Sequence, residues 1–199
     1  MIAIPQCLDF PDAHRTKEIC DFFLKMLEIK NRELYLHSQQ VANYAASTAA
    51  KLGLPAAEVA RIKTAAQLHD IGQLGIPNST LAKFPYLSTR EYTVYKRHAV
   101  AGAAMLENMP ELMYIADIIR AHHEKWDGTG FPKRLKGQNI PLGARIIAVC
   151  NYYDRFLNPC TQHWCVKHGD ATKELLDKIG LDFDQTVVKA FIDSVLPKK

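Results

Sequence analysis

Apolar residues recur at helical spacing along almost the whole chain. The first such segment spans residues 12–29, with Asp12 as its expected N-cap. Its apolar positions are Ile19, Phe22, Phe23, Met26 and Leu27. A second helix is predicted over residues 31–52, where alanines at helical spacing are typical of close helix packing and Gly53 ends the pattern.

Capping residues and turn formers divide the rest of the chain. Pro55 fits the first turn of a third helix that ends near Ile71-Gly72, and residues 75–78 form a turn. Ser88 and Glu91 have the spacing of a capping box. Helices are predicted from there to about Asn108, over residues 111–123, 142–157 and 184–195.

Residues 124–141 interrupt the helical pattern. They contain Gly128, Gly130, Pro132, Gly137 and Pro141, which predict an ordered loop. Loops of this length in compact domains are often functional. No alternating strand pattern, internal repeat or linker is present, so the sequence predicts one compact all-α domain.

Composition sets the class of protein. The chain has 199 residues, of which 48% are hydrophobic, enough for one sizeable core. A net charge of +4 suits an anionic small ligand but is too weak to indicate nucleic-acid binding. No apolar stretch reaches the length of a membrane span, and the N-terminus lacks the basic region of a signal peptide.

The five cysteines form no regular framework, which favours free thiols and a cytoplasmic location. One group joins two cysteines and two histidines: Cys160, His163, Cys165 and His168. Their spacing is unlike that of zinc fingers, so we expect an ordinary loop there, with zinc binding as the alternative.

The chemistry centres on the adjacent residues His69 and Asp70. Further histidines stand at positions 37, 98, 122 and 123, and Glu33 is one helical turn before His37. Imidazole and carboxylate groups bind transition metals, and two metal ions are a common device for hydrolysis of phosphorus esters. Any one of these histidines alone is more simply a core or surface residue; the set predicts a metal-dependent phosphohydrolase.

Four segments give the chain a family resemblance. They are Leu68-His69-Asp70-Ile71-Gly72, Gly75-Ile76-Pro77, the run from His122 to Pro132, and the run from Ile140 to Val149. Over about residues 30 to 195 the chain resembles the HD-GYP family, a branch of the HD metal-dependent phosphohydrolases. We therefore predict an N-terminal helical extension over residues 1–30 and an HD-GYP-like domain over residues 31–199.

The resemblance implies an all-α fold, a site for two or three metal ions, often iron or manganese, and hydrolysis of the bacterial second messenger cyclic di-GMP. Because of the departure at residue 151 described below, we expect one to three ions in this chain. Carried over by motif position, the metal ligands are Glu33, His37, His69, Asp70, His98, His122 and His123. Asp70 is expected to bridge two ions, whose activated water attacks phosphorus. For Glu33, a plain surface carboxylate is the alternative.

Two departures from the family affect the predicted centre. Gln73 replaces a lysine that faces the scissile phosphate, so a neutral hydrogen bond replaces a charge at this catalytic position. The other reading of Gln73 is a helix-end residue without a role. Asn151 replaces an aspartate ligand, and we expect either a weak metal ligand or a residue that hydrogen-bonds to a ligand.

Two further departures concern substrate. A basic run after Asp154 is missing, since its places hold Cys160, His163 and Trp164, and Phe131 replaces a tyrosine. We predict that Gly128 lies at the substrate edge of the site, while Asp127 shapes the loop. Arg145 either contacts a substrate phosphate or pairs with a nearby carboxylate.

The first hypothesis is a divergent phosphodiesterase, impaired in activity, that acts on a cyclic dinucleotide or a related phosphoester. The second is a catalytically inactive signalling module that binds metal or nucleotide. A phosphatase acting on nucleoside phosphates fits less well, because of the Gly-Thr-Gly-Phe-Pro loop at residues 128–132. In either case we expect the input signal to come from a protein partner.

Overall fold

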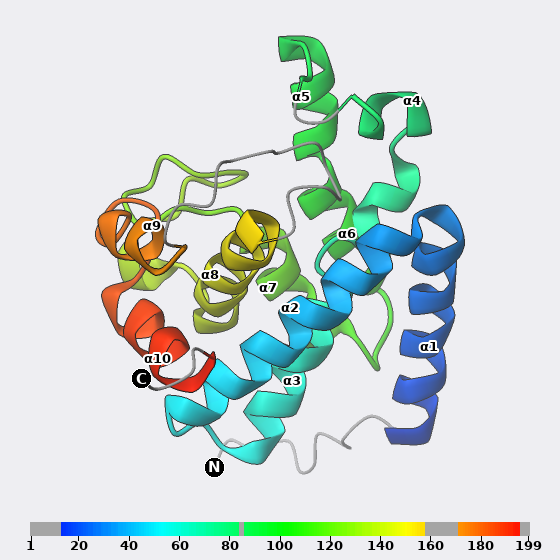
Figure 1. Ribbon diagram of the computed structural model, residues 1–199. Coiled ribbons are helices and arrows are strands. Elements are labelled where there is room, and N and C mark those ends of the chain that lie inside the picture. The colour runs from blue at the N-terminus through cyan, green and yellow to red at the C-terminus, as the bar shows by residue number, and fades with distance from the viewer. Residues whose placement is uncertain (1–12, 84–85, 158–170, 196–199) are drawn as a thin grey trace, which may run out of the picture.

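The computed structural model describes residues 13–83, 86–157 and 171–195, and within them it is built from helices without strands (Figure 1). The predicted all-α class is therefore confirmed. Asp12, the cluster at 160–168 and the positions of the basic run lie outside the described residues. None of the described helices is both long and apolar enough to cross a membrane.

The described residues form α-helices and short 3₁₀ turns. In order they are α1 (Ala13–Lys30), α2 (Arg32–Lys51), α3 (Ala56–Leu68), η1 (Ile71–Gly75), α4 (Asn78–Leu81), α5 (Thr89–Lys96), α6 (His98–Leu106), η2 (Met113–Ile115), α7 (Ala116–Ala121), η3 (Gly137–Asn139), α8 (Leu142–Leu157), α9 (Ala171–Asp177) and α10 (Gln185–Val195). The η elements are 3₁₀ turns.

Helix α2 lies at the centre of the core and packs against α1, α3, α8 and α10 (Figure 1). Its inner face is made of Val41, Ala42, Ala45 and Ala49, all fully buried. Small side chains let neighbouring helices approach closely, as the alanine pattern predicted. Helix α1 adds Phe23 to the same core. The division of the chain at residue 30 stays a prediction.

Side-chain caps explain where two helices begin. The side chain of Asn31 accepts hydrogen bonds from the first backbone N–H groups of α2. Ser88 and Glu91 form the predicted capping box at the start of α5.

Three predicted helices were too long, and the short helices α4 and α9 were not predicted. The third helix ends at Leu68, the helix predicted to reach Asn108 breaks at Arg97, and the one predicted over 111–123 shortens to α7 preceded by η2. At each of these places a histidine ring binds a backbone carbonyl three residues earlier. Such a side-chain bond competes with continuation of the helix. The spacing of apolar residues does not predict these bonds, so the helix ends were missed.

Gly72 allows η1 to lie directly against α6. A β-carbon at this position would lie 2.0 Å from the backbone oxygen of His98 and 2.6 Å from the nitrogen of Gly102. Only glycine fits so close a backbone approach. The contact brings the segment that contains Asp70 next to the start of α6.

Candidate metal centre

Asp70 lies where the ends of α3, α7 and the α5–α6 junction meet, and it is fully buried. The structure describes two groups of side chains whose ligand atoms lie within 4.8 Å of one another, and Asp70 belongs to both. One group is Asp70, His98, His122 and His123, and the other is His37, His69 and Asp70. Six of the predicted ligands therefore meet at one place.

Backbone carbonyls orient three of the histidine rings in the same way. Nδ1 of His69 lies 2.8 Å from the oxygen of Ala66. The corresponding bond of His98 is 2.7 Å to Tyr95, and that of His122 is 2.6 Å to Ile119. Because a carbonyl only accepts, Nδ1 carries the proton and Nε2 presents a lone pair, which is the arrangement of metal-binding histidines.

The donor atoms at the centre fit a cation. Nε2 of His69 and Oδ1 of Asp70 are buried and have no hydrogen-bond partner among the residues that the structure describes. Nε2 of His98 lies 3.4 Å from Nε2 of His122 and 3.1 Å from Nε2 of His123. A cation between these atoms would satisfy them, and imidazole with carboxylate is a donor set for transition metals.

Charge at the centre is set by burial and by the neighbouring rings. Burial, reinforced by the other histidines, holds the pKa of His122 and of His123 well below the usual value. Burial alone would raise the pKa of Asp70, but His69 and His98 outweigh it and hold that pKa well below the usual range. The centre therefore combines the ionised carboxylate of Asp70 with neutral imidazoles of His122 and His123, the forms that bind a metal.

The second group has a different environment. Nδ1 of His37 lies 2.6 Å from Oδ2 of Asp154, and its Nε2 lies 3.0 Å from Oδ1 of Asn151. Burial lowers the pKa of His37 although Asp154 opposes the shift. The structure thus brings Asn151, the predicted replacement of an aspartate ligand, to the edge of the second group.

Arg155 reaches the centre and was missed by sequence analysis. Its Nε donates to Oδ1 of Asn151 at 2.7 Å, and its Nη2 lies 3.1 Å from Oδ2 of Asp70. Nη1 lies 3.3 Å from the hydroxyl of Tyr95. The signal was its position one helical turn after Asn151 on α8, which puts both side chains on one face.

The other predicted site residues lie outside the two groups. Glu33 is exposed in the first turn of α2. Gln73 is buried in η1, and its Nε2 has no hydrogen-bond partner among the described residues. Arg145 pairs with Asp184 at 2.7 Å and donates to the oxygen of Ile140. Their predicted roles stay predictions.

The loop after α7 is held against the centre by Glu124, a second residue that sequence analysis missed. Its buried carboxylate accepts from the backbone nitrogens of Lys133 at 2.6 Å and Leu135 at 3.1 Å. Gly128 occupies a turn with a φ of 87°, and Phe131 stacks on the ring of His123 with centroids 4.8 Å apart. The ring of Phe131 therefore forms one edge of the centre.

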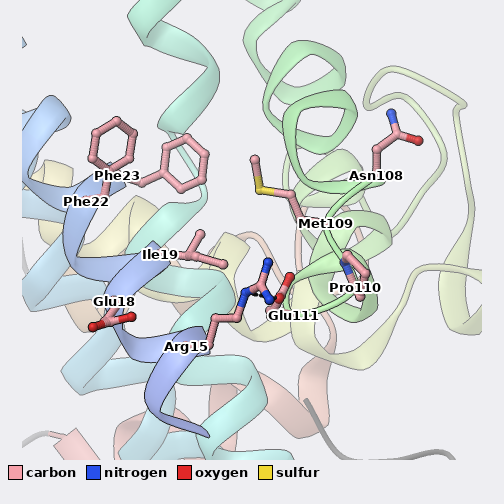
Figure 2. Close-up of a pocket in the computed structure, with 9 residues that line it drawn as sticks. All are labelled: Arg15, Glu18, Ile19, Phe22, Phe23, Asn108, Met109, Pro110 and Glu111. Atoms are coloured by element: carbon pink, nitrogen blue, oxygen red, sulfur yellow. Dashed lines mark ion pairs between the residues drawn. The ribbon is translucent and has the colours of Figure 1, made fainter. Parts of the chain in front are cut away.

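A separate surface groove of about 460 Å³ lies between α1 and residues 108–111. Figure 2 shows Ile19, Phe23 and Met109 along it, with Arg15 and Glu111 paired at one end. None of its lining residues belongs to the metal centre.

Comparison with known proteins identifies the family. The sequence profile of the HD domain matches residues 21–187, which is most of the chain. The chain belongs to the HD-domain family. The adjacent residues His69 and Asp70, at the middle of the centre described above, lie within the matched residues.

The curated relatives agree with the HD-GYP resemblance, which is confirmed. The 3'3'-cGAMP-specific phosphodiesterase 2 of Vibrio cholerae is 32% identical over 89% of this chain and 34% of its own length. A cyclic di-GMP phosphodiesterase of Thermotoga maritima is 33% identical over 86% of this chain and 49% of its own length. The chain thus spans between a third and a half of these relatives.

An HDG"Y"P protein of Bdellovibrio bacteriovorus has a similar fold. Its TM-score is 0.68 at 20% identity, over 92% of this chain and 64% of the other. At that identity the likeness concerns the fold alone.

Proposed function

We propose that this chain is a metal-dependent phosphodiesterase that hydrolyses a cyclic dinucleotide. The observation that carries the proposal is the buried Asp70 carboxylate facing the Nε2 atoms of His98, His122 and His123. A site of this kind, with neutral imidazoles and an ionised carboxylate, is suited to phosphoester hydrolysis rather than to a structural role.

Each residue of the centre has a stated task in this proposal. Asp70, His98, His122 and His123 hold the principal ion, and the backbone carbonyls behind His98 and His122 fix their rings. A bound ion supplies Lewis acidity and an activated water. Phe131, stacked on His123, offers a flat apolar face for a base of the substrate.

The substrate class rests on the relatives. Two proteins about one-third identical to this chain are named for the hydrolysis of 3'3'-cGAMP and of cyclic di-GMP. We propose cyclic di-GMP, or a related cyclic dinucleotide, as the substrate. A guanine base and two phosphates match a centre with an aromatic edge and a bound cation.

Iron or manganese is the proposed metal, because an imidazole-rich set with one carboxylate suits these ions. We further propose a cytoplasmic bacterial signalling protein whose input comes from a protein partner. Cys20 and Cys150 are buried free thiols, as expected in a reducing compartment.

The second candidate function is an inactive binding module. It is favoured by Asn151, a neutral amide at the edge of the second group, and by Gln73, which brings no charge to the site. In this case the centre would bind metal and nucleotide without turnover.

The test is hydrolysis of cyclic di-GMP and 3'3'-cGAMP by protein loaded without oxygen with Mn²⁺ or Fe²⁺. We expect turnover that falls at least about 100-fold in Asp70→Asn. The matched control is Asp193→Asn, an exposed aspartate of α10, which should keep full activity. Nucleotide binding without hydrolysis by any metal form would favour the binding module and contradict the proposed phosphodiesterase activity.

A further inference from the structure

The guanidinium of Arg155 occupies the side of the centre that a second ion would need. It donates to Oδ1 of Asn151 at 2.7 Å and to Oδ2 of Asp70 at 3.1 Å. These two oxygens face the group formed by His37, His69 and Asp70. A guanidinium has only donors, so it takes up oxygen ligands and offers none.

The positive charge of Arg155 is fixed. A guanidinium stays protonated in proteins, and this one lies against the carboxylate of Asp70. Its side chain is 22% exposed, and its contacts with described residues include Asn151 on α8, Tyr95 on α5 and Asp70. A divalent ion at the same place would meet repulsion from this charge as well as the loss of both oxygens.

The two groups of the centre are therefore not equivalent. Oδ1 of Asp70 faces His98 at 3.2 Å and lies on the side away from the guanidinium contact, which is made by Oδ2. Asp70 thus has one oxygen directed to the first group and the other engaged by arginine. Asn151 fits this arrangement, because a neutral amide can accept from Arg155 without adding a second negative charge.

We infer that Arg155 takes the place of one of two metal ions, so that this centre binds a single divalent ion beside a built-in guanidinium. The inference rests on the proposed metal-dependent function.

The experiment counts ions in the purified full chain. Protein stripped of metal is titrated with Mn²⁺, bound manganese per chain is measured by mass spectrometry, and the electron paramagnetic resonance spectrum is recorded. We expect one ion with the six-line spectrum of isolated Mn²⁺. In Asn151→Asp/Arg155→Gln, which supplies a carboxylate and removes the charge, we expect two ions and the spectrum of a coupled pair.

Two controls separate charge from general damage. Arg155→Lys keeps a cation and should still bind one ion. Arg61→Ala removes an arginine of α3 that pairs with Glu58, outside the centre, and should leave the count at one. Circular dichroism checks that each variant is folded.

The possible outcomes are distinguishable. Two ions in the unaltered chain would overturn the inference and leave the proposed function standing. No bound ion in the unaltered chain would overturn the proposed function, and the inference with it. A folded double variant that still binds one ion would show that Arg155 does not replace a metal.

Discussion

Gln73 is a buried amide only three residues after Asp70. Its side chain is 2% exposed, and Nε2 finds no hydrogen-bond partner in the described part of the protein. A buried donor without a partner costs free energy of folding, and such costs are common where a ligand supplies the missing acceptor. A phosphate oxygen of the substrate would serve as that acceptor.

Gln73→Lys should raise kcat on cyclic di-GMP by about 10- to 100-fold, since a charged donor stabilises a developing phosphoryl charge more than an amide does. The variant should also unfold at lower denaturant concentration without substrate, because a buried ammonium is costly. Steady-state kinetics and urea unfolding measure both effects. Gln185→Lys, the same change at an exposed position of α10, is the control. Unchanged kcat in Gln73→Lys would mean that residue 73 does not face the phosphate.

At the level of elements, the centre depends on where helices stop. Three ligand histidines lie at helix ends, and each binds the carbonyl three residues before it. The same bond ends the helix and orients the ring. Packing between η1 and α6 then sets the distance between Asp70 and His98, whose Oδ1 and Nε2 lie 3.2 Å apart.

Gly72→Ala should therefore damage the centre by separating these two elements. The added carbon would lie 2.0 Å from the His98 oxygen, so the backbone must move. We expect a loss of about 1–3 kcal/mol in the free energy of unfolding and weaker Mn²⁺ binding. Urea unfolding and calorimetric titration measure these quantities.

Gly75→Ala is the matched control for this change. Gly75 belongs to the same 3₁₀ turn, but nothing lies within 4 Å of the position its β-carbon would take. It should keep both stability and metal affinity. Equal behaviour of the two variants would show that the close approach at Gly72 does not matter.

For the whole molecule, helical periodicity was enough to predict the all-α class and the positions of α2, α8 and α10. Residue type and motif order were enough to predict that five histidines and one aspartate lie at one centre. What could not be predicted depends on contacts distant in sequence. The bond between Arg155 and Asp70 joins residues 85 positions apart, and the turn at Gly72 is set by α6.

Burial of neutral histidines should make the metal-free protein less stable in mild acid. The pKa values of His37, His122 and His123 are lowered mainly by burial. In the unfolded chain a histidine has a pKa of about 6.5. As pH falls through that value, the unfolded chain binds protons that the folded chain does not, so the free energy of unfolding decreases.

The lowered pKa of Asp70 acts in a different pH window. In the unfolded chain an aspartate has a pKa of about 3.9, so the contribution of Asp70 to the free energy of unfolding is lost only in stronger acid. Between pH 7.5 and 5.5 the histidines therefore account for the loss, with a slope of up to about 1.4 kcal/mol per pH unit for each one. Urea unfolding in a metal chelator measures it, and His122→Asn should reduce the slope. Equal stability at the two pH values would mean that these histidines take up protons as readily in the folded chain as in the unfolded one, and that burial does not lower their pKa.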